Sequence, residues 1–160
     1  MEKTSYSCCF TGHRTIKKEH IVALRNKLEE TLEILIRSGT DTFRTGGAMG
    51  FDTLAALCVL DKREEYPHIK LELCLPCRNQ TAKWREDDIR IYEEILSRAD
   101  KVTYLHDTYI NGCMLERNRF MVDGCDYCIA YFTHPRGGTE YTVNYAKKKQ
   151  VKLVNLATLI

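Results

Sequence analysis

The amino-acid sequence predicts an α/β fold, a Rossmann-like domain of three layers in which helices flank a mostly parallel sheet. Short apolar segments rich in β-branched and aromatic residues alternate with helical patterns along the whole chain. The connections are short, and no linker, repeat or low-complexity segment interrupts them, so residues 1–160 are expected to form a single domain. Glycine or polar residues follow three of the predicted strands, which is where such folds bind their ligands.

The first half of the chain alternates strands and helices between clear stop signals. Apolar side chains recur every three or four positions in the first helix, which Gly39 ends. The second helix is rich in Ala and Leu and apolar nearly all round, so it should be well buried. Pro76 closes the third strand. In order, the predicted segments are strand 6–11, helix 21–36, strand 42–45, helix 52–62 and strand 69–75.

The second half continues the alternation. Ile91, Ile95 and Leu96 mark the inner side of its first helix, and a polar loop follows the next strand. The last helix ends in three lysines, which complement the negative end of its dipole. In order, the predicted segments are helix 84–99, strand 101–105, helix 113–123, strand 127–132, helix 139–149 and strand 151–156.

The most informative stretch runs from Asp126 to Thr139. A buried strand ends there at Pro135 and at the pair Gly137 and Gly138, which permit backbone angles that other residues resist. Thr139 is expected to cap the helix that follows. A strand, a glycine turn and a helix N-terminus direct free N–H groups at one spot that no side chain blocks, and such a spot attracts phosphate. A tight turn without any ligand is the alternative.

Two further strands end in the same kind of turn. Because the carboxyl ends of parallel strands open on one edge of a sheet, the three turns are expected to converge there. A tight turn explains any single one, but their coincidence favours an anionic, phosphate-bearing ligand. The residues expected to bind it are Thr11, Gly12, His13 and Arg14 in the first turn, Gly46, Gly47, Gly50 and Asp52 in the second, and Gly137, Gly138 and Thr139 in the third.

The predicted helix 113–123 begins at the same edge of the sheet. At 100° per residue, Asn118 falls at the centre of its apolar face, where a buried amide needs partners. Arg117 and Arg119 flank that face, and an arginine there can hold a phosphate in a bidentate fork. Arg117, Asn118 and Arg119 therefore join the expected ligand-binding residues. Surface ion pairs with neighbouring acidic residues are the alternative for both arginines.

The composition narrows the class of protein. A net charge of +2, without a basic tail or a dense Lys/Arg stripe, means that nucleic acid is not expected as a partner. No apolar run approaches the length of a membrane span, and the N-terminus lacks a signal-peptide pattern. A cytoplasmic protein without a membrane partner is expected, and a homo-oligomer stays open.

Eight cysteines need an explanation in a chain with no export signal. Two Cys-x-x-Cys pairs, Cys74/Cys77 and Cys125/Cys128, could in principle form a zinc site. Cys74 and Cys128 fall within predicted strands, however, and no glycine follows either pair to make a tight turn. Buried thiols that act as small apolar side chains are the favoured interpretation, and no metal is expected.

Four segments together carry a family resemblance: residues 9–14, 46–56, 112–123, and 137–139 with 142–147. On these the chain is similar to the YpsA-like proteins of the SLOG superfamily, which includes the SMF/DprA and LOG proteins. The resemblance covers nearly the whole chain and implies a Rossmann-like fold. It also implies a pocket for a nucleotide or nucleotide-derived molecule, which the family is thought to sense or process. No cofactor beyond such a ligand is expected.

Within the superfamily, LOG-type enzymes use an Arg from an Arg-Lys-x-x-Met helix and a Glu from a Pro-Gly-Gly-x-Gly-Thr-x-x-Glu turn. Arg117, four residues before Met121, matches the arginine of the first motif. The second motif is shortened, and no acid stands three positions after Thr139. An oxocarbenium-like transition state needs a carboxylate close by, so Glu140 and Asp52 join Arg117 as catalytic candidates.

Three functions therefore stay open. The first is a sensor or processing protein that binds a nucleotide-derived, phosphate-bearing ligand. The second is a LOG-like phosphoribohydrolase, an N-glycosidase acting on nucleoside monophosphates. The third, by analogy with DprA, is binding of single-stranded nucleic acid, which needs a basic groove with stacking aromatics that the modest net charge does not favour.

Overall fold

The computed structural model describes residues 4–160; residues 1–3, which the predicted domain includes, lie outside the described part. The strands are β1 (Tyr6–Gly12), β2 (Thr40–Thr45), β3 (Lys70–Leu75), β4 (Lys101–Tyr104), β5 (Tyr127–Tyr131) and β6 (Lys152–Asn155). The longer helices are α1 (Ile21–Arg37), α2 (Phe51–Glu65), α3 (Glu86–Arg98), α4 (Cys113–Val122) and α5 (Gly137–Lys148). Each predicted strand and helix is present, with ends shifted by a few residues.

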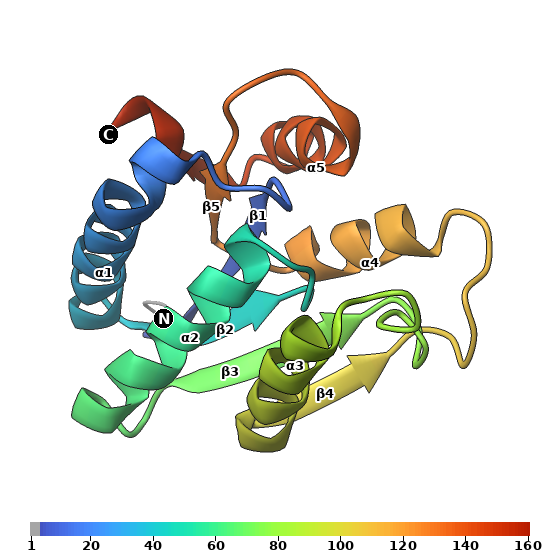
Figure 1. Cartoon of the computed structure of the whole chain (residues 1–160). Helices are drawn as coiled ribbons and strands as arrows, with labels where there is room; N and C mark the ends of the chain where they lie inside the picture. Colours follow the sequence, from blue (N-terminus) through green and yellow to red (C-terminus); the bar gives the residue numbers. More distant parts are fainter. Residues whose placement is uncertain (1–3) are drawn as a thin grey trace.

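Within residues 4–160, the six strands form one sheet in the order β4-β3-β2-β1-β5-β6, and every neighbouring pair is parallel. Helices cover both faces of this sheet (Figure 1). The predicted Rossmann-like, three-layer fold is thus confirmed, and the mostly parallel sheet is wholly parallel.

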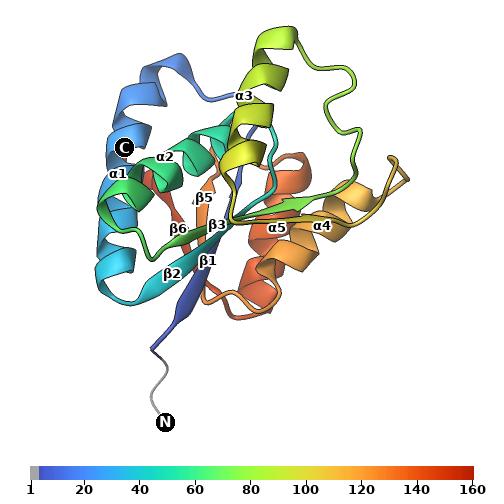
Figure 2. The same cartoon turned by 90° about the horizontal axis from the view of Figure 1, so that it is seen from below.

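Figure 2 shows α1, α2 and α3 on one side of the sheet and α4 and α5 on the other. Two cores, one on each face, hold these layers together. Successive residues of β1 alternate between them: Phe10 joins the larger core under α1, α2 and α3, and Cys9 joins the smaller core under α4 and α5. Leu24, Leu28 and Leu32 lie four residues apart on α1 and are fully buried, as the helical period requires. The sheet is therefore fixed between packed helices, and its strand ends are rigid supports for a site.

The strand order reverses at β1. Strands β2, β3 and β4 continue on one side of it, and β5 and β6 lie on the other. Gly12 pairs with Tyr131, so the carboxyl ends of β1 and β5 lie next to each other. Open parallel sheets bind ligands at such a reversal point.

One local prediction is wrong. Thr139 does not cap α5, because the helix begins at Gly137 with Arg136 as its N-cap residue. Gly137 has a φ of +61°, so the chain turns into the helix at the glycine pair itself. Thr139 is instead buried in the first turn. Separately, no helix in residues 4–160 has the length and apolar character that crossing a membrane requires.

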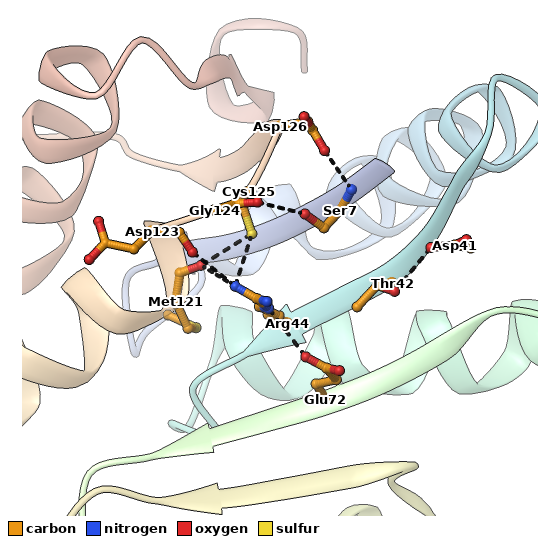
Figure 3. Close-up of polar contacts among 10 residues, drawn as sticks. All are labelled: Ser7, Asp41, Thr42, Arg44, Glu72, Met121, Asp123, Gly124, Cys125 and Asp126. Carbon is orange, nitrogen blue, oxygen red and sulfur yellow. Dashed lines mark hydrogen bonds and ion pairs between the residues drawn. The ribbon is translucent and has the colours of Figure 1, made fainter. Parts of the chain in front are cut away.

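A polar cluster under the carboxyl-terminal end of α4 ties that helix to the sheet (Figure 3). Arg44 of β2 donates from Nε to Glu72 Oε1 at 3.2 Å and from Nη1 to the Asp123 carbonyl at 3.0 Å. On the β1 side, the Ser7 N–H donates to Asp126 Oδ2 at 2.9 Å. These bonds fix the turn between α4 and β5 and so hold α4 in place over the sheet.

Candidate functional site

A cavity of about 480 Å³ opens at the carboxyl ends of β1 and β5, where residues from all three predicted turns meet. Nine residues that the sequence indicated as ligand-binding line it: Thr11, Gly12, His13, Arg14, Asp52, Arg117, Asn118, Gly138 and Thr139. Five others from that set are absent from its lining: Gly46, Gly47, Gly50, Arg119 and Gly137. Of the catalytic candidates, Asp52 and Arg117 line the cavity and Glu140 does not.

His13 is held at the mouth of this cavity by its own hydrogen bonds. Its backbone accepts from the Phe51 N–H at 3.2 Å, and its Nε2 accepts from the Thr133 N–H at 3.1 Å. The ring stacks on His134 with centroids 4.2 Å apart and planes 14° from parallel. Burial lowers the pKa of His13, and His134 and Lys17 lower it further. A neutral imidazole that can donate from Nδ1 follows from this arrangement.

The glycines after β2 serve close packing instead of lining the cavity. A Cβ on Gly50 would stand 2.2 Å from the Arg14 carbonyl oxygen, and the φ of Gly50 is +77°. A Cβ on Gly46 would stand 2.6 Å from Arg117 Nη1. Only glycine lets this turn approach the Arg14 backbone and the Arg117 guanidinium so closely. The turn therefore positions Arg14 and Arg117, which are the residues that reach the cavity.

Asp52, in the first turn of α2, is a buried carboxyl in the cavity wall. Its side chain accepts from the Ala48 N–H at 3.2 Å, and the residue is 6% exposed. Burial raises the pKa of Asp52 to about 6, although Arg117, the Ala48 N–H and Arg14 each lower it. A carboxyl with this pKa can gain or lose a proton near neutral pH.

Arg117 is the charged residue buried deepest at the site, with 4% of its surface exposed. It donates to the Gly46 carbonyl, to the Cys74 carbonyl at 3.5 Å and from Nε to Asn118 Oδ1 at 2.8 Å. Burial lowers the pKa of Arg117, and Asp52 opposes that shift. The expectation that Asn118 occupies the buried centre of this face is therefore wrong. Carbonyl groups at the strand ends attract the guanidinium, and α4 is rotated so that Arg117 faces the sheet.

Arg119 turns away from the cavity. Its Nη1 donates to Tyr141 Oη at 2.9 Å on the outer side of α4 and α5. The Tyr141 ring stacks in turn on Tyr145, with centroids 6.3 Å apart. Arg119 thus joins two helices through a tyrosine hydroxyl, and not through the ion pair with a neighbouring acidic residue that was the alternative expectation.

The first turn of α5 forms the opposite wall, through Arg136, Gly138 and Thr139. A Cβ on Gly138 would meet Asn118 Nδ2 at 3.5 Å, an ordinary contact, so the glycine leaves open space above the helix N-terminus. The first N–H groups of a helix have no partner within it and can bind an anion. This wall is therefore suited to a phosphate.

Sequence reasoning missed several lining residues: Phe10, Ala48, Met114, Leu115, Met121, His134 and Arg136. His134 and Arg136 had a usable signal, because they flank the Pro135 turn that already pointed to a ligand. The apolar residues had none, since a Met or Leu on a helix face is normally a core residue.

The eight cysteines are free thiols and all are buried within the described residues. Burial raises the pKa of Cys74 to about 12, so this thiol stays protonated at neutral pH. Cys9, Cys74, Cys125 and Cys128 pack together in the smaller core. In residues 4–160, no group of three or more His, Cys, Asp or Glu side chains is arranged to hold a metal ion.

The fold and the cavity define an α/β protein of Rossmann-like class with a cationic site at the strand-order reversal. The YpsA family model, described as "YspA SLOG family", matches residues 8–159, and the chain belongs to this family. The chain is 31% identical over 146 residues to YoqJ, an uncharacterised SPβ prophage-derived protein of Bacillus subtilis, covering 83% of this chain and 85% of that one. It is also 31% identical over 141 residues to a UPF0398 protein of Brevibacillus brevis, covering 86% and 71% of the two chains.

Among solved structures, the chain is similar to DNA processing protein A (DprA) from Helicobacter pylori, a structure described for its single-stranded DNA binding mode. The TM-score is 0.69 at 19% sequence identity, and the match covers 92% of this chain. This chain spans 63% of the length of that protein. At this identity the likeness is one of fold.

Proposed function

We propose that this protein binds a nucleotide or a nucleotide-derived, phosphate-bearing ligand in the cavity at the carboxyl ends of β1 and β5, as a sensor or as a protein that processes the ligand. The observation that carries the proposal is charge. Arg14, Arg117 and Arg136 line the cavity, and Asp52 is the acid among its lining residues. A phosphate would meet three cations there against one carboxyl whose pKa is raised to about 6.

Arg14 and Arg136 are the arginines free to hold the ligand. Both are exposed, and within residues 4–160 no hydrogen bond or ion pair occupies either guanidinium. Arg117 already donates to protein carbonyls, so it supplies positive charge from beneath the ligand. We assign the phosphate to Arg14, Arg136 and the first N–H groups of α5, which Gly138 leaves accessible.

Replacing Gly138 with Val tests this assignment, because the added side chain stands over the N-terminus of α5. Calorimetric titration with nucleoside monophosphates and with inorganic phosphate should show binding to the wild type. In Gly138→Val, the affinity is expected to fall roughly 10- to 100-fold, the worth of a hydrogen bond to a charged group. The fold should stay intact, since the new Cβ meets Asn118 Nδ2 at 3.5 Å. Unchanged affinity would argue against the site.

Two arginines give a matched control for that measurement. Arg136 lines the cavity, whereas Arg119 donates to Tyr141 outside it. Arg136→Ala is expected to weaken phosphate and nucleotide binding, and Arg119→Ala to leave both unchanged. Equal losses in the two variants would mean that net charge, and not this cavity, attracts the ligand.

A phosphoribohydrolase is the second candidate function, and Asp52 is the observation that favours it. Hydrolysis of an N-glycosidic bond needs a carboxylate beside the cationic sugar, and Asp52 lines the cavity where Glu140 does not. Incubation with nucleoside monophosphates, followed by chromatography for free base, tests this reaction. Release by the wild type and its loss in Asp52→Asn and Arg117→Ala would support an enzyme. Intact nucleotide, bound but never cleaved, would leave a binding protein.

Binding of single-stranded nucleic acid is the third candidate. The structural likeness to a single-stranded DNA-binding protein weakens the expectation that nucleic acid is not a partner. Gel shifts with single-stranded oligonucleotides at several salt concentrations test the idea, because phosphate contacts make such binding salt-dependent. The absence of any shift at low salt would remove this candidate.

A further inference from the structure

A second cavity, of about 640 Å³, adjoins the first. Arg14 and Met114 line both, so the two cavities share one border. Most of the remaining wall comes from the loop between β3 and α3 and from the loop between β4 and α4. The phosphate site proposed above uses neither of these loops.

Hydrogen bonds hold the two loops together. The Tyr109 N–H donates to Asn79 Oδ1 at 3.0 Å. The Arg78 N–H donates to the Asp107 carbonyl at 3.3 Å, and the two side chains form an ion pair at 3.2 Å. The loops therefore form one joined wall, and a ligand that enters need not first order them.

The wall of the second cavity combines aromatic and apolar side chains with polar ones. Trp84 and Tyr109 contribute aromatic rings, and Met49 and Met114 contribute thioethers. The Trp84 ring packs edge-on against Tyr92, with centroids 5.5 Å apart and planes at 81°, which fixes its orientation. Tyr109 is 59% exposed, so much of its surface is available to a ligand.

We infer that the second cavity binds the heteroaromatic base of the nucleotide whose phosphate lies in the first; this inference rests on the proposed function. Bases stack on aromatic side chains whatever their identity, which fits Trp84 and Tyr109. Asn79 accepts the Tyr109 N–H through Oδ1, and its NH₂ group can donate to an acceptor on the edge of the base. Arg14 stands at the border of the two cavities, where the sugar phosphate passes.

The chain contains a single tryptophan, so Trp84 fluorescence reports on this cavity directly. The wild-type protein is titrated with AMP, GMP, CMP and UMP, and separately with ribose 5-phosphate, by calorimetry and by fluorescence. The nucleotides are expected to bind and to change the Trp84 emission with the same Kd in both measurements. Ribose 5-phosphate is expected to bind more weakly and to leave the emission unchanged.

Tyr109→Ala provides the second measurement. This exposed loop residue can be truncated without disturbing the core, and the change is expected to weaken nucleotide binding about tenfold through lost stacking. Ribose 5-phosphate should bind as before. Phe120→Ala is the matched control, because Phe120 is 42% exposed and lines neither cavity. It should change neither affinity.

The outcomes separate this inference from the function on which it rests. Nucleotides that bind without any response of Trp84 or of Tyr109→Ala would overturn the base site and leave the phosphate site standing. A Trp84 response to single-stranded oligonucleotides, and none to mononucleotides, would also overturn it. No binding of nucleotide, ribose 5-phosphate or inorganic phosphate would overturn the proposed function, and the base site with it.

Discussion

Two arginine–carboxylate pairs under α4 differ in how fully the protein satisfies them. Arg44 and Glu72 form an ion pair at 3.2 Å with side chains 25% and 20% exposed, and Arg44 also donates to the Asp123 carbonyl. Arg117 and Asp52 are more deeply buried, at 4% and 6% exposed. Nevertheless, no ion pair within 4.0 Å joins them in the described part of the chain. Arg117 and Asp52, whose burial costs more free energy, are therefore less completely paired than Arg44 and Glu72.

The pKa shifts follow this difference. Burial lowers the pKa of Arg44, but the combined effect of Cys125, Glu72 and Cys74 outweighs burial, and the net shift is upward. For Arg117, burial prevails and the net shift is downward, while the pKa of Asp52 is raised. The Arg44 cluster is complete without a ligand and holds the fold. Arg117 and Asp52 line the cavity, where the proposed phosphate would add negative charge that partners Arg117.

The largest effect is expected from Asp52→Asn. A folded pKa of about 6 against an ordinary value of 3.8 means that the folded state binds the proton more tightly. Stability is therefore lost as the pH rises from about 4 to about 6, by up to ~3 kcal/mol. Asn keeps an acceptor for the Ala48 N–H and carries no charge. In urea unfolding at pH 7.5, the free energy of unfolding should be larger for the variant than for the wild type, and this difference should shrink toward pH 4. A difference in unfolding free energy that does not change with pH would contradict the raised pKa of Asp52.

Replacing Arg117 with Met asks whether this arginine serves the ligand or the fold. A Met of similar length fills the buried space, but the Gly46 and Cys74 carbonyls lose their donor, so the free energy of unfolding should fall by about 1–3 kcal/mol. Binding of inorganic phosphate and of nucleoside monophosphates should weaken roughly tenfold, because the positive charge beneath the phosphate is lost. Calorimetry and urea unfolding on the same preparation separate the two effects. A variant with greatly reduced stability and unchanged affinity for phosphate and nucleotides would show that Arg117 serves the fold and not the ligand.

Much of this molecule could be predicted from the sequence, because its elements follow local periods. The four-residue spacing of Leu24, Leu28 and Leu32 fixes α1. The position of the cavity also follows from local signals, since glycines after a strand mark a turn, and parallel strand ends share an edge. For that reason Arg14 and Gly138, far apart in the chain, were both expected at the cavity that they line.

The features that could not be predicted from the sequence depend on contacts between distant segments. The apolar pattern of α4 favoured Asn118 as the buried residue, but the Gly46 and Cys74 carbonyls select Arg117. Similarly, Gly50 does not line the cavity, and its lack of a side chain makes room for the Arg14 backbone. A local sequence pattern does not identify a contact partner that lies tens of residues away. The direction of a side chain and the role of a glycine could therefore be determined only from the structure.

The smallest effect is expected from the same substitution at the other arginine. Arg44→Met leaves Glu72 without its cation and the Asp123 carbonyl without a donor. Since both side chains are partly exposed, water recovers part of the loss, and the free energy of unfolding should fall by about 1–2 kcal/mol. Neither Arg44 nor Glu72 lines the cavity, so nucleotide affinity should stay unchanged. If Arg44→Met lowered affinity as much as Arg117→Met does, the cluster would belong to the site, and the contrast between a completed pair and an open one would no longer hold.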